Sequence, residues 1–320
     1  MIDQPSPAPI VLLDARFPDI DLMCDTVRLW DLDLRPLQLD PNGGEAGRVV
    51  QMLGPTGGYG YCGLGGSFDQ YGSAPPGVFT FAIRKAGAGN IWWRSLDTVE
   101  GEVLVYKPGG EVRCVNGMGF GVHTISVDAV QLHEICDALE ISCPDPATLP
   151  EVFRLPLEIM PTLYADLEMC RDGPPGEATA LVHKLSEILV GTWVAQHQTR
   201  FRARPTLRAR DRAIRNCLEF LEQADLSTVD MKQLMLRANV SKRTLQYAFQ
   251  EKFQSTPHGF LRALRMSRVR NLLRQARYGG ATIGDLAASQ GIWHHGRFSQ
   301  DYKKMFGETP VQTRQRQLAG

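Results

Sequence analysis

Two stretches in the last third of the chain carry side chains that can form hydrogen bonds with DNA bases and phosphates at matching positions. The first, residues 234–257, reads LMLRANVSKRTLQYAFQEKFQSTP, and the second, residues 286–310, reads LAASQGIWHHGRFSQDYKKMFGETP. Each begins with apolar and small residues, turns at Asn or Gly, and ends with an aromatic residue before Thr-Pro. Two copies are too few for a solenoid, which needs at least three units to bury a continuous core. The pattern favours two helix-turn-helix units.

The first unit has a suitable turn and cap for a helix that reads bases. Asn239 tolerates the left-handed backbone of a tight turn, and Ser241 is a good N-cap. With Leu245 and Phe249 facing inward, polar residues remain outward, where Arg and Gln can pair with guanine and adenine edges in the major groove. The predicted DNA contacts of this unit are Ser241, Lys242, Arg243, Gln246 and Tyr247.

The second unit repeats this design with different contact residues. Thr282 is its expected N-cap, Gly291 makes its turn, and Phe298 faces inward with Tyr302 and Phe306. Its adjacent histidines do not predict a metal site, because neighbours on a helix do not face one point. The predicted contacts are the base-facing His295, Arg297, Ser299 and Gln300 and the phosphate-facing Lys303 and Lys304.

A long helix over residues 258–275 is expected between the two units. A rigid connection would fix their separation, and adjacent major-groove entries on one face of DNA lie about 34 Å apart. Its apolar residues predict a buried face, and its arginines are expected on the opposite, exposed face. These are Arg262, Arg265, Arg268 and Arg270.

The formal net charge of zero conceals a strong asymmetry. From Arg200 onward there are 23 Lys and Arg against 9 Asp and Glu, a net charge of +14, and the preceding residues carry −14. A basic half is a sign of nucleic-acid binding. Residues 200–207 form an Arg-rich segment that serves as a linker or contacts phosphates.

The cysteines and the hydropathy pattern indicate an intracellular protein. Seven cysteines are scattered without a CxxC pair, which argues against a disulfide framework or structural zinc and favours a reducing compartment. The start of the chain lacks the pattern of a signal peptide, and no stretch has the roughly 18 apolar residues of a membrane span. We expect a cytoplasmic protein without membrane contact.

The acidic half predicts a small β-barrel or sandwich. Residues 1–20 are Pro-rich and are expected to be a flexible segment. Short apolar runs separated by Gly and Pro then predict seven or eight strands, followed by a helix capped by Asp128. The clearest runs are residues 27–34, 49–53, 78–84, 91–94, 102–107, 112–115 and 121–127.

A barrel of this size can enclose a small molecule. A metal-dependent oxygenase would need two or three histidines and a carboxylate, but the strands offer only His123, expected to be packed or hydrogen-bonded, with His133 on the next helix. No catalytic residue, metal or cofactor is predicted. Trp92 and Trp93 point to opposite faces of a strand. The candidate effector-binding residues are Arg84, Trp92, Trp93, Arg94, Tyr106 and Arg113.

Residues 177–198 form the clearest amphipathic helix of the acidic half. Four of its residues follow the spacing of a helix–helix seam. Such a short seam can pack on its own barrel or pair two copies of the chain, and both interpretations stay open. The residues are Leu181, Leu185, Ile188 and Thr192.

Residues 208–316 resemble the AraC/XylS family of bacterial transcription regulators. The resemblance rests on LMLRANVSKRTLQYAF, FLRALRMSRVRNLLR, TIGDLAASQGIW and FSQDYKKMFGETPVQTR. It implies a seven-helix domain whose two reading helices enter successive major grooves, with Arg243 and His295 among the base-facing positions. Met235, Asn239 and the residues 293–295 depart from the family pattern. The segment GEVLVYKPGGEV loosely resembles the family's regulatory barrel, which implies effector sensing or dimerisation.

The sequence therefore predicts an α+β chain with an N-terminal small β-barrel, cupin-like and flanked by helices, and an all-α C-terminal domain. We expect residues 21–199 to sense an effector or to dimerise. Residues 208–316 are expected to bind double-stranded DNA as the domain of a sequence-specific regulator. The expected partners include a small-molecule effector, RNA polymerase and a second copy in a homodimer. The alternative is a DNA-tethered enzyme with its chemistry in the barrel.

Overall fold

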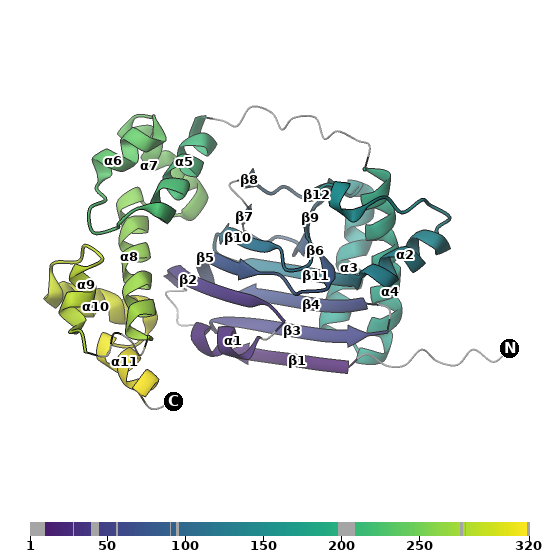
Figure 1. The fold of residues 1–320 in the computed structure, drawn as a ribbon, viewed down its shortest axis with the longest axis horizontal. Helices are drawn as coiled ribbons and strands as arrows, with labels where there is room; N and C mark the ends of the chain where they lie inside the picture. The colour runs from purple at the N-terminus through teal and green to yellow at the C-terminus, as the bar shows by residue number, and fades with distance from the viewer. Residues whose placement is uncertain are drawn as a thin grey trace.

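The chain folds into an N-terminal domain rich in β-sheet and a C-terminal region made of helices (Figure 1). The computed structural model describes residues 10–318 except 28, 40–44, 56, 90, 94–95, 198–208, 276–277 and 279. This mixed architecture confirms the predicted fold class. The predicted Arg-rich linker at 200–207 lies outside the described residues. Within the described part of the chain, no helix is both long and apolar enough to span a bilayer.

The strands form two antiparallel sheets rather than a closed barrel. The larger sheet has the order β1 (Ile10–Phe17), β3 (Gly47–Gly54), β4 (Gly57–Leu64), β11 (Phe120–Asp128), β6 (Val78–Arg84), β9 (Glu102–Tyr106), β12 (Val152–Arg154). The smaller sheet has the order β2 (Asp31–Leu39), β5 (Gly66–Ser73), β10 (Glu111–Asn116), β7 (Ile91–Trp93), β8 (Leu96–Asp97). The two sheets pack face to face around a shared apolar core.

Five strands, β1, β4, β5, β8 and β12, were not among the runs predicted from the sequence, and β2 begins at Asp31 rather than at residue 27. Residues 10–17, expected to belong to the flexible segment, form β1 because they pair with β3 along its whole length. The predicted strands also omitted β4 and β5, whose sequences are rich in glycine. Glycine disfavours strands locally, but β4 lies between β3 and β11 and hydrogen-bonds to both. Tertiary pairing therefore overrides the local preference.

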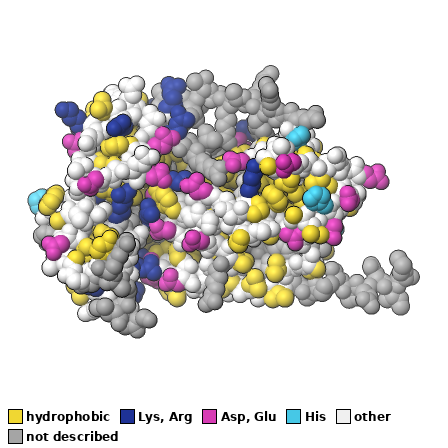
Figure 2. Space-filling model, in the orientation of Figure 1, with side chains coloured by type: hydrophobic (Ala, Val, Ile, Leu, Met, Phe, Trp, Pro, Cys, Tyr) yellow, Lys and Arg dark blue, Asp and Glu magenta, His cyan; other side chains and the backbone are white. Residues whose placement is uncertain are grey.

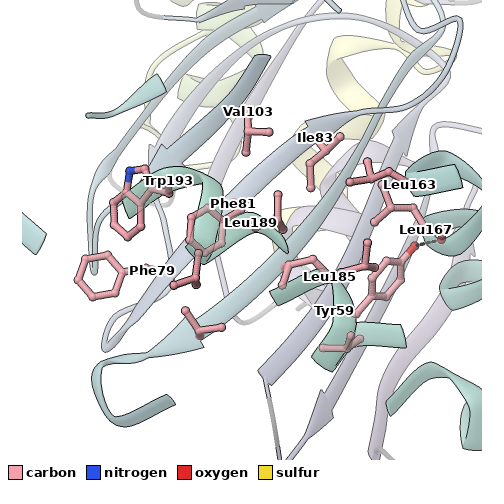
Figure 3. Packing of buried hydrophobic residues seen from close by; sticks show 14 of the residues in the cluster. Tyr59, Phe79, Phe81, Ile83, Val103, Leu163, Leu167, Leu185, Leu189 and Trp193 are labelled. Atoms are coloured by element: carbon pink, nitrogen blue, oxygen red, sulfur yellow. Dashed lines mark hydrogen bonds between the residues drawn. The ribbon is translucent and has the colours of Figure 1, made fainter. Parts of the chain in front are cut away.

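Helices cover the outer face of the larger sheet. Trp193, fully buried, lies at an angle of 83° to Phe81 with ring centroids 5.3 Å apart, and the Tyr59 hydroxyl donates to the Leu167 carbonyl (Figure 3). Asp128 caps the first of the covering helices with a capping box, as predicted. The helical elements of this domain are α1 (Ile20–Thr26), α2 (Ala129–Ala138), η1 (Pro146–Thr148), η2 (Leu157–Ile159), α3 (Met160–Asp172) and α4 (Pro175–Ala195).

Two helix-turn-helix units make up the C-terminal region, on either side of one long helix. The helices are α5 (Ala209–Gln223), α6 (Met231–Ala238), α7 (Lys242–Phe253), α8 (Pro257–Leu273), α9 (Ile283–Ala288), α10 (His295–Phe306) and α11 (Pro310–Leu318). Ser241 and Thr282 accept the backbone hydrogen bonds expected of N-caps. Asn239 and Gly291 adopt the left-handed conformation that their turns require, with φ of 51° and 78°. The local predictions for both turns are confirmed.

The left-handed turn at Asn239 generates a stability prediction. Replacing Asn239 by Gly removes the Cβ that disfavours this conformation and should raise the free energy of unfolding by up to about 1 kcal/mol. Asn239→Val should lower it by more than about 1 kcal/mol. Chemical denaturation followed by helical circular dichroism measures both. A glycine variant less stable than the valine variant would contradict the role of this turn.

Candidate nucleic-acid interface

The outward face of α7 presents the predicted reading residues of the first unit. Lys242, Arg243 and Gln246 are exposed, and Tyr247 is 51% exposed. The Arg243 guanidinium donates to the Tyr247 hydroxyl at 3.3 Å and lies 5.5 Å from the centre of its ring. Ser241 is occupied as the helix cap, with its Oγ accepting from the Thr244 amide at 3.2 Å. The exposed face therefore offers hydrogen-bond donors along one side of the helix.

Arg210 on α5 is a neighbour that sequence reasoning missed. Its guanidinium lies 5.9 Å from the centre of the Tyr247 ring and pairs with Glu251 on α7 at 2.9 Å. The spacing of Arg210 from α7 in the sequence gives no sign of this contact. Arg210 and Arg243 both contact the same exposed ring.

The outward face of α10 carries the second set. Arg297 has a side chain 78% exposed and lies 3.7 Å from Asp301, which also pairs with Arg262 of α8. Ser299, Gln300, Lys303 and Lys304 are exposed, and Phe298, Tyr302 and Phe306 are buried as predicted. His295 opens α10, but its side chain is outside the described part. Trp293, just before the helix, is 66% exposed.

Both units turn a polar outer face away from an aromatic core. The first packs Phe249, Phe253 and Phe260 together, and the second packs its inward aromatics against the other end of α8. On the face seen in Figure 2, most Lys and Arg side chains lie over the C-terminal half. One rigid helix thus carries two similar faces with an excess of positive charge.

The arginines predicted to be exposed on α8 are instead partly or fully buried. Arg265 donates to the carbonyls of Leu226 and Val229, and Arg268 donates to that of Leu221 at 3.0 Å. Arg270 is only 3% exposed. The prediction failed because α8 has no free face: α5 and the α5–α6 segment cover one side, and the N-terminal domain covers another.

An ionic cluster joins α8 to α1 of the N-terminal domain. Arg270 pairs with Asp21, and Arg274 pairs with Asp21 at 2.6 Å and with Asp25 at 3.4 Å. Arg270 also contacts Glu308 at 3.1 Å, just before α11. Burial raises the pKa of Asp21 although Arg270 and Arg274 oppose the shift. The acidic half therefore docks on the basic half through buried charges.

The cluster continues into α11. Arg316 lies 3.0 Å from Glu308 and 3.6 Å from Asp19, the N-cap of α1. One turn of α1 thus faces two separate helices of the C-terminal region.

A second contact between the halves is apolar. Trp92, 2% exposed, lies with its ring centroid 6.4 Å from that of Phe253 at the end of α7, while Lys252 lies over the indole at 5.7 Å. Trp93 points the other way, into the core between the sheets, 6.0 Å from Tyr106. The prediction that the two indoles point to opposite faces of the strand is confirmed. The interface partner is the first reading unit.

A cavity of about 90 Å³ lies between the two sheets. Arg84 and Tyr106, two of the predicted effector residues, line it with Met23 and Val27 from α1 and its C-terminal end. Trp92 and Arg113 instead face the C-terminal region, where Arg113 lies 3.4 Å from Glu222 of α5. Arg94 lies outside the described residues. The structure therefore brings together only part of the predicted effector set.

The Arg84 guanidinium is already occupied. It donates to the carbonyls of Thr98 and Ala88, each at 2.8 Å. The cavity lining is otherwise mostly apolar, so its chemistry is that of a hydrophobic pocket with few polar groups.

His123 is buried on the other face of the larger sheet and not in the cavity. Its Nδ1 shares a hydrogen bond with the Tyr59 hydroxyl at 2.8 Å, and burial lowers its pKa to about 3. This matches the expected packed, hydrogen-bonded histidine. Across the described residues, no three His, Cys, Asp or Glu side chains come together in a way that could hold a metal ion.

The predicted dimerisation seam on α4 is partly occupied by its own domain. Leu185 is fully buried in the core between α4 and the larger sheet, whereas Leu181 and Ile188 are partly buried at its margin. Leu185 is therefore not accessible to a second copy, and the seam as a whole stays a prediction.

Fold and geometry together define a protein with two tandem helix-turn-helix units. Residues 234–316 match the family model described as a helix-turn-helix domain. The predicted helix-turn-helix domain of AraC/XylS type at the C-terminal end is confirmed.

Curated relatives match over this part of the chain. The probable thc operon regulatory protein of Rhodococcus erythropolis is 30% identical over 116 residues, which are 36% of this chain and 35% of that protein. The XylDLEGF operon transcriptional activator of Pseudomonas putida is 27% identical over 96 residues, 30% of each chain. The chain thus spans about a third of the length of these relatives.

Solved structures match across both halves. The AraC-like transcriptional activator CuxR has 16% identity and a TM-score of 0.40, covering 87% of this chain and 99% of its own. A variant of apo ToxT from Vibrio cholerae has 9% identity and a TM-score of 0.33, covering 89% of this chain and 97% of its own.

Asp69 on β5 is a buried carboxyl group in the face that the smaller sheet turns to the C-terminal region. It is 4% exposed, and burial raises its pKa to about 7 although Arg113 and Arg35 oppose the shift. The folded protein thus keeps a proton that an unfolded Asp, with a pKa of 3.8, releases. Stability should therefore fall as the pH rises from about 4 to 7 and level off above.

Substituting Asp69→Asn should remove this contribution, which has a slope of at most about 1.4 kcal/mol per pH unit. The quantity to measure is the midpoint of thermal unfolding of the variant minus that of the wild type. This difference should rise between pH 5 and pH 7 and stay constant above pH 7. Asp166→Asn, at a carboxylate paired with Lys184 far from this face, is the control. A difference independent of pH would contradict the buried, protonated Asp69.

Proposed function

We propose that the chain is a sequence-specific DNA-binding transcription regulator. The observation that carries the proposal is the pair of equivalent reading helices, α7 and α10, on either side of the rigid helix α8. The match of residues 234–316 to the helix-turn-helix domain supports it, as does the net charge of +14 from Arg200 onward. The two units would enter successive major grooves on one face of the duplex.

Within the proposed interface the side chains divide by chemistry. Arg243, Gln246 and Tyr247 of the first unit would contact base edges, together with His295, Arg297, Ser299 and Gln300 of the second. Lys242, Lys303 and Lys304 would contact phosphates, with Ser241 at the helix cap. Bidentate Arg and Gln contacts specify sequence, whereas Lys contacts add affinity for any duplex.

Arg243→Ala tests the assignment to a base. It should cost about 1–3 kcal/mol of binding to a selected site and relax the sequence preference at one position. Selection from a random duplex library, followed by gel shift on the selected site, measures both effects. Arg16→Ala, an exposed arginine of β1, should leave both unchanged.

An unaltered preference in Arg243→Ala would refute the assignment. Lys303→Ala provides the comparison, because losing a phosphate contact should weaken binding to all sequences similarly and reduce the salt dependence.

We propose that the N-terminal domain controls DNA binding through α1. One face of α1 places Met23 in the cavity wall, and the other places Asp21 and Asp25 against Arg270 and Arg274 of α8. An effector in the cavity would displace α1 and so weaken its hold on α8. The effector can shift the equilibrium between the docked and released states by at most the difference in its binding free energy for these two states.

Asp21→Asn weakens this ionic contact without removing the side chain. If docking restrains the reading units, the variant should bind a selected DNA site about tenfold more tightly than the wild type, as measured by gel shift. Asp166→Asn serves as the matched control, because its carboxylate pairs with Lys184 inside the N-terminal domain. Equal or weaker binding by Asp21→Asn would contradict control through α1.

We further propose a division of the chain into two functional units. Residues 21–199 would form the sensing unit and residues 208–316 the DNA-binding unit, joined by residues 200–207. The protein would act in the cytoplasm as a homodimer that contacts RNA polymerase at its promoters, with no enzymatic step.

A further inference from the structure

The cavity between the sheets contains a polar position that the protein itself does not use. Gln51 of β3 and Thr124 of β11 line the cavity, and each is more than nine-tenths buried. In the part of the chain that the structure describes, neither the Gln51 amide nor the Thr124 hydroxyl forms a hydrogen bond. Buried polar side chains without partners are rare in folded proteins. These two therefore need a partner that the fold does not supply.

The register of the sheet places these two residues on either side of a glycine. Gln51 and Thr124 are both paired with Gly60, the residue of β4 that lies between them. A Cβ at Gly60 would lie 2.5 Å from the Thr124 Oγ1. The absence of a side chain at Gly60 thus makes room for the Thr124 hydroxyl, and the Gln51 side chain lines the same cavity from the strand on the other side of Gly60.

The rest of the lining sets the charge and polarity of an occupant. No Asp or Glu among the described residues lines the cavity, and its one cationic side chain, Arg84, is bound to the Thr98 and Ala88 carbonyls. A buried ammonium group would have no carboxylate partner, and a carboxylate would have to compete with the Thr98 and Ala88 carbonyls for Arg84. Burying either charge costs more than burying a neutral group. Apolar side chains such as Val49, Leu104 and Val122 form most of the wall.

We propose that this cavity binds a small, uncharged, mainly hydrocarbon molecule through one hydrogen-bonding group held by Gln51 and Thr124 over Gly60. The inference rests on the proposed effector control and gives the effector a chemical class. The volume of about 90 Å³ limits the molecule to a few heavy atoms, since a cavity of about 150 Å³ accommodates benzene. Gln51 can donate and accept, so a hydroxyl, carbonyl or amide group suits the site.

Three probes of similar size distinguish a hydrogen-bonding, an apolar and a charged ligand: butan-1-ol, 1-chlorobutane and butanoate. Each is titrated into the full chain with methyl-labelled methionine, and the Met23 methyl resonance reports binding because Met23 lines the cavity at 1% exposure. Butan-1-ol should bind about three- to tenfold more tightly than 1-chlorobutane, the range expected for one neutral hydrogen bond. Butanoate should bind more weakly than either.

Gln51→Leu should abolish the preference for the alcohol while 1-chlorobutane still binds. Gly60→Ala should weaken the binding of both probes, because its methyl group would displace the Thr124 hydroxyl. Gly58→Ala, two residues away on β4, is the matched control, since its Cβ would meet its nearest neighbour at 3.5 Å. If Gly60→Ala fails to fold, the Gln51→Leu comparison still decides.

Equal binding of alcohol and chloroalkane, tightest binding of butanoate, or no shift of Met23 with any probe would overturn the inference. Sequence-specific DNA binding by the same preparation separates this failure from that of the proposed function. If the protein still binds DNA, the proposed function as a regulator is retained and only the proposed effector class is rejected.

Discussion

The contact between Arg270 and Asp21 is the interaction on which the arrangement of the two halves depends. An arginine with 3% exposure needs partners for its charge, and Asp21 of α1 and Glu308, just before α11, both contact its Nη2. Removing one member of a buried ion pair costs far more than a surface pair is worth, because it leaves the other charge uncompensated. The N-terminal domain, the linking helix α8 and α11 are therefore held together at one point.

The same short helix joins this charged cluster to the interior of the N-terminal domain. Met23 packs in the core between the sheets, while the carboxylates of α1 face the C-terminal region. Helix α1 is packed against the core on one face and forms ion pairs on the other. Because protein interiors have little free volume, a shift of α1 at the cavity also moves its carboxylates. This arrangement offers a physical route between the cavity and α8, and α8 carries both reading units.

Local chemistry was sufficient to predict the reading units, and long-range contacts explain what was missed. Ser241, Asn239 and Gly291 act within a few residues of themselves, so the caps and turns could be read from the sequence. The glycine-rich strand β4 depends on its neighbours: Gly60 is required by Thr124, 64 positions away. Arg270 was expected at the surface, because helical spacing cannot show that Asp21, 249 positions earlier, covers it. The hydrogen-bonding role of Gln51 and Thr124 likewise emerges only from strand register.

The two helix-turn-helix units are proposed to read one duplex together. Selection of a binding site by the full chain, followed by footprinting of that site with a groove-sensitive chemical probe, tests it most directly. Two protected major-groove segments about 10 base pairs apart on one face of the DNA are expected. A single protected segment, or no enriched sequence at all, would contradict it.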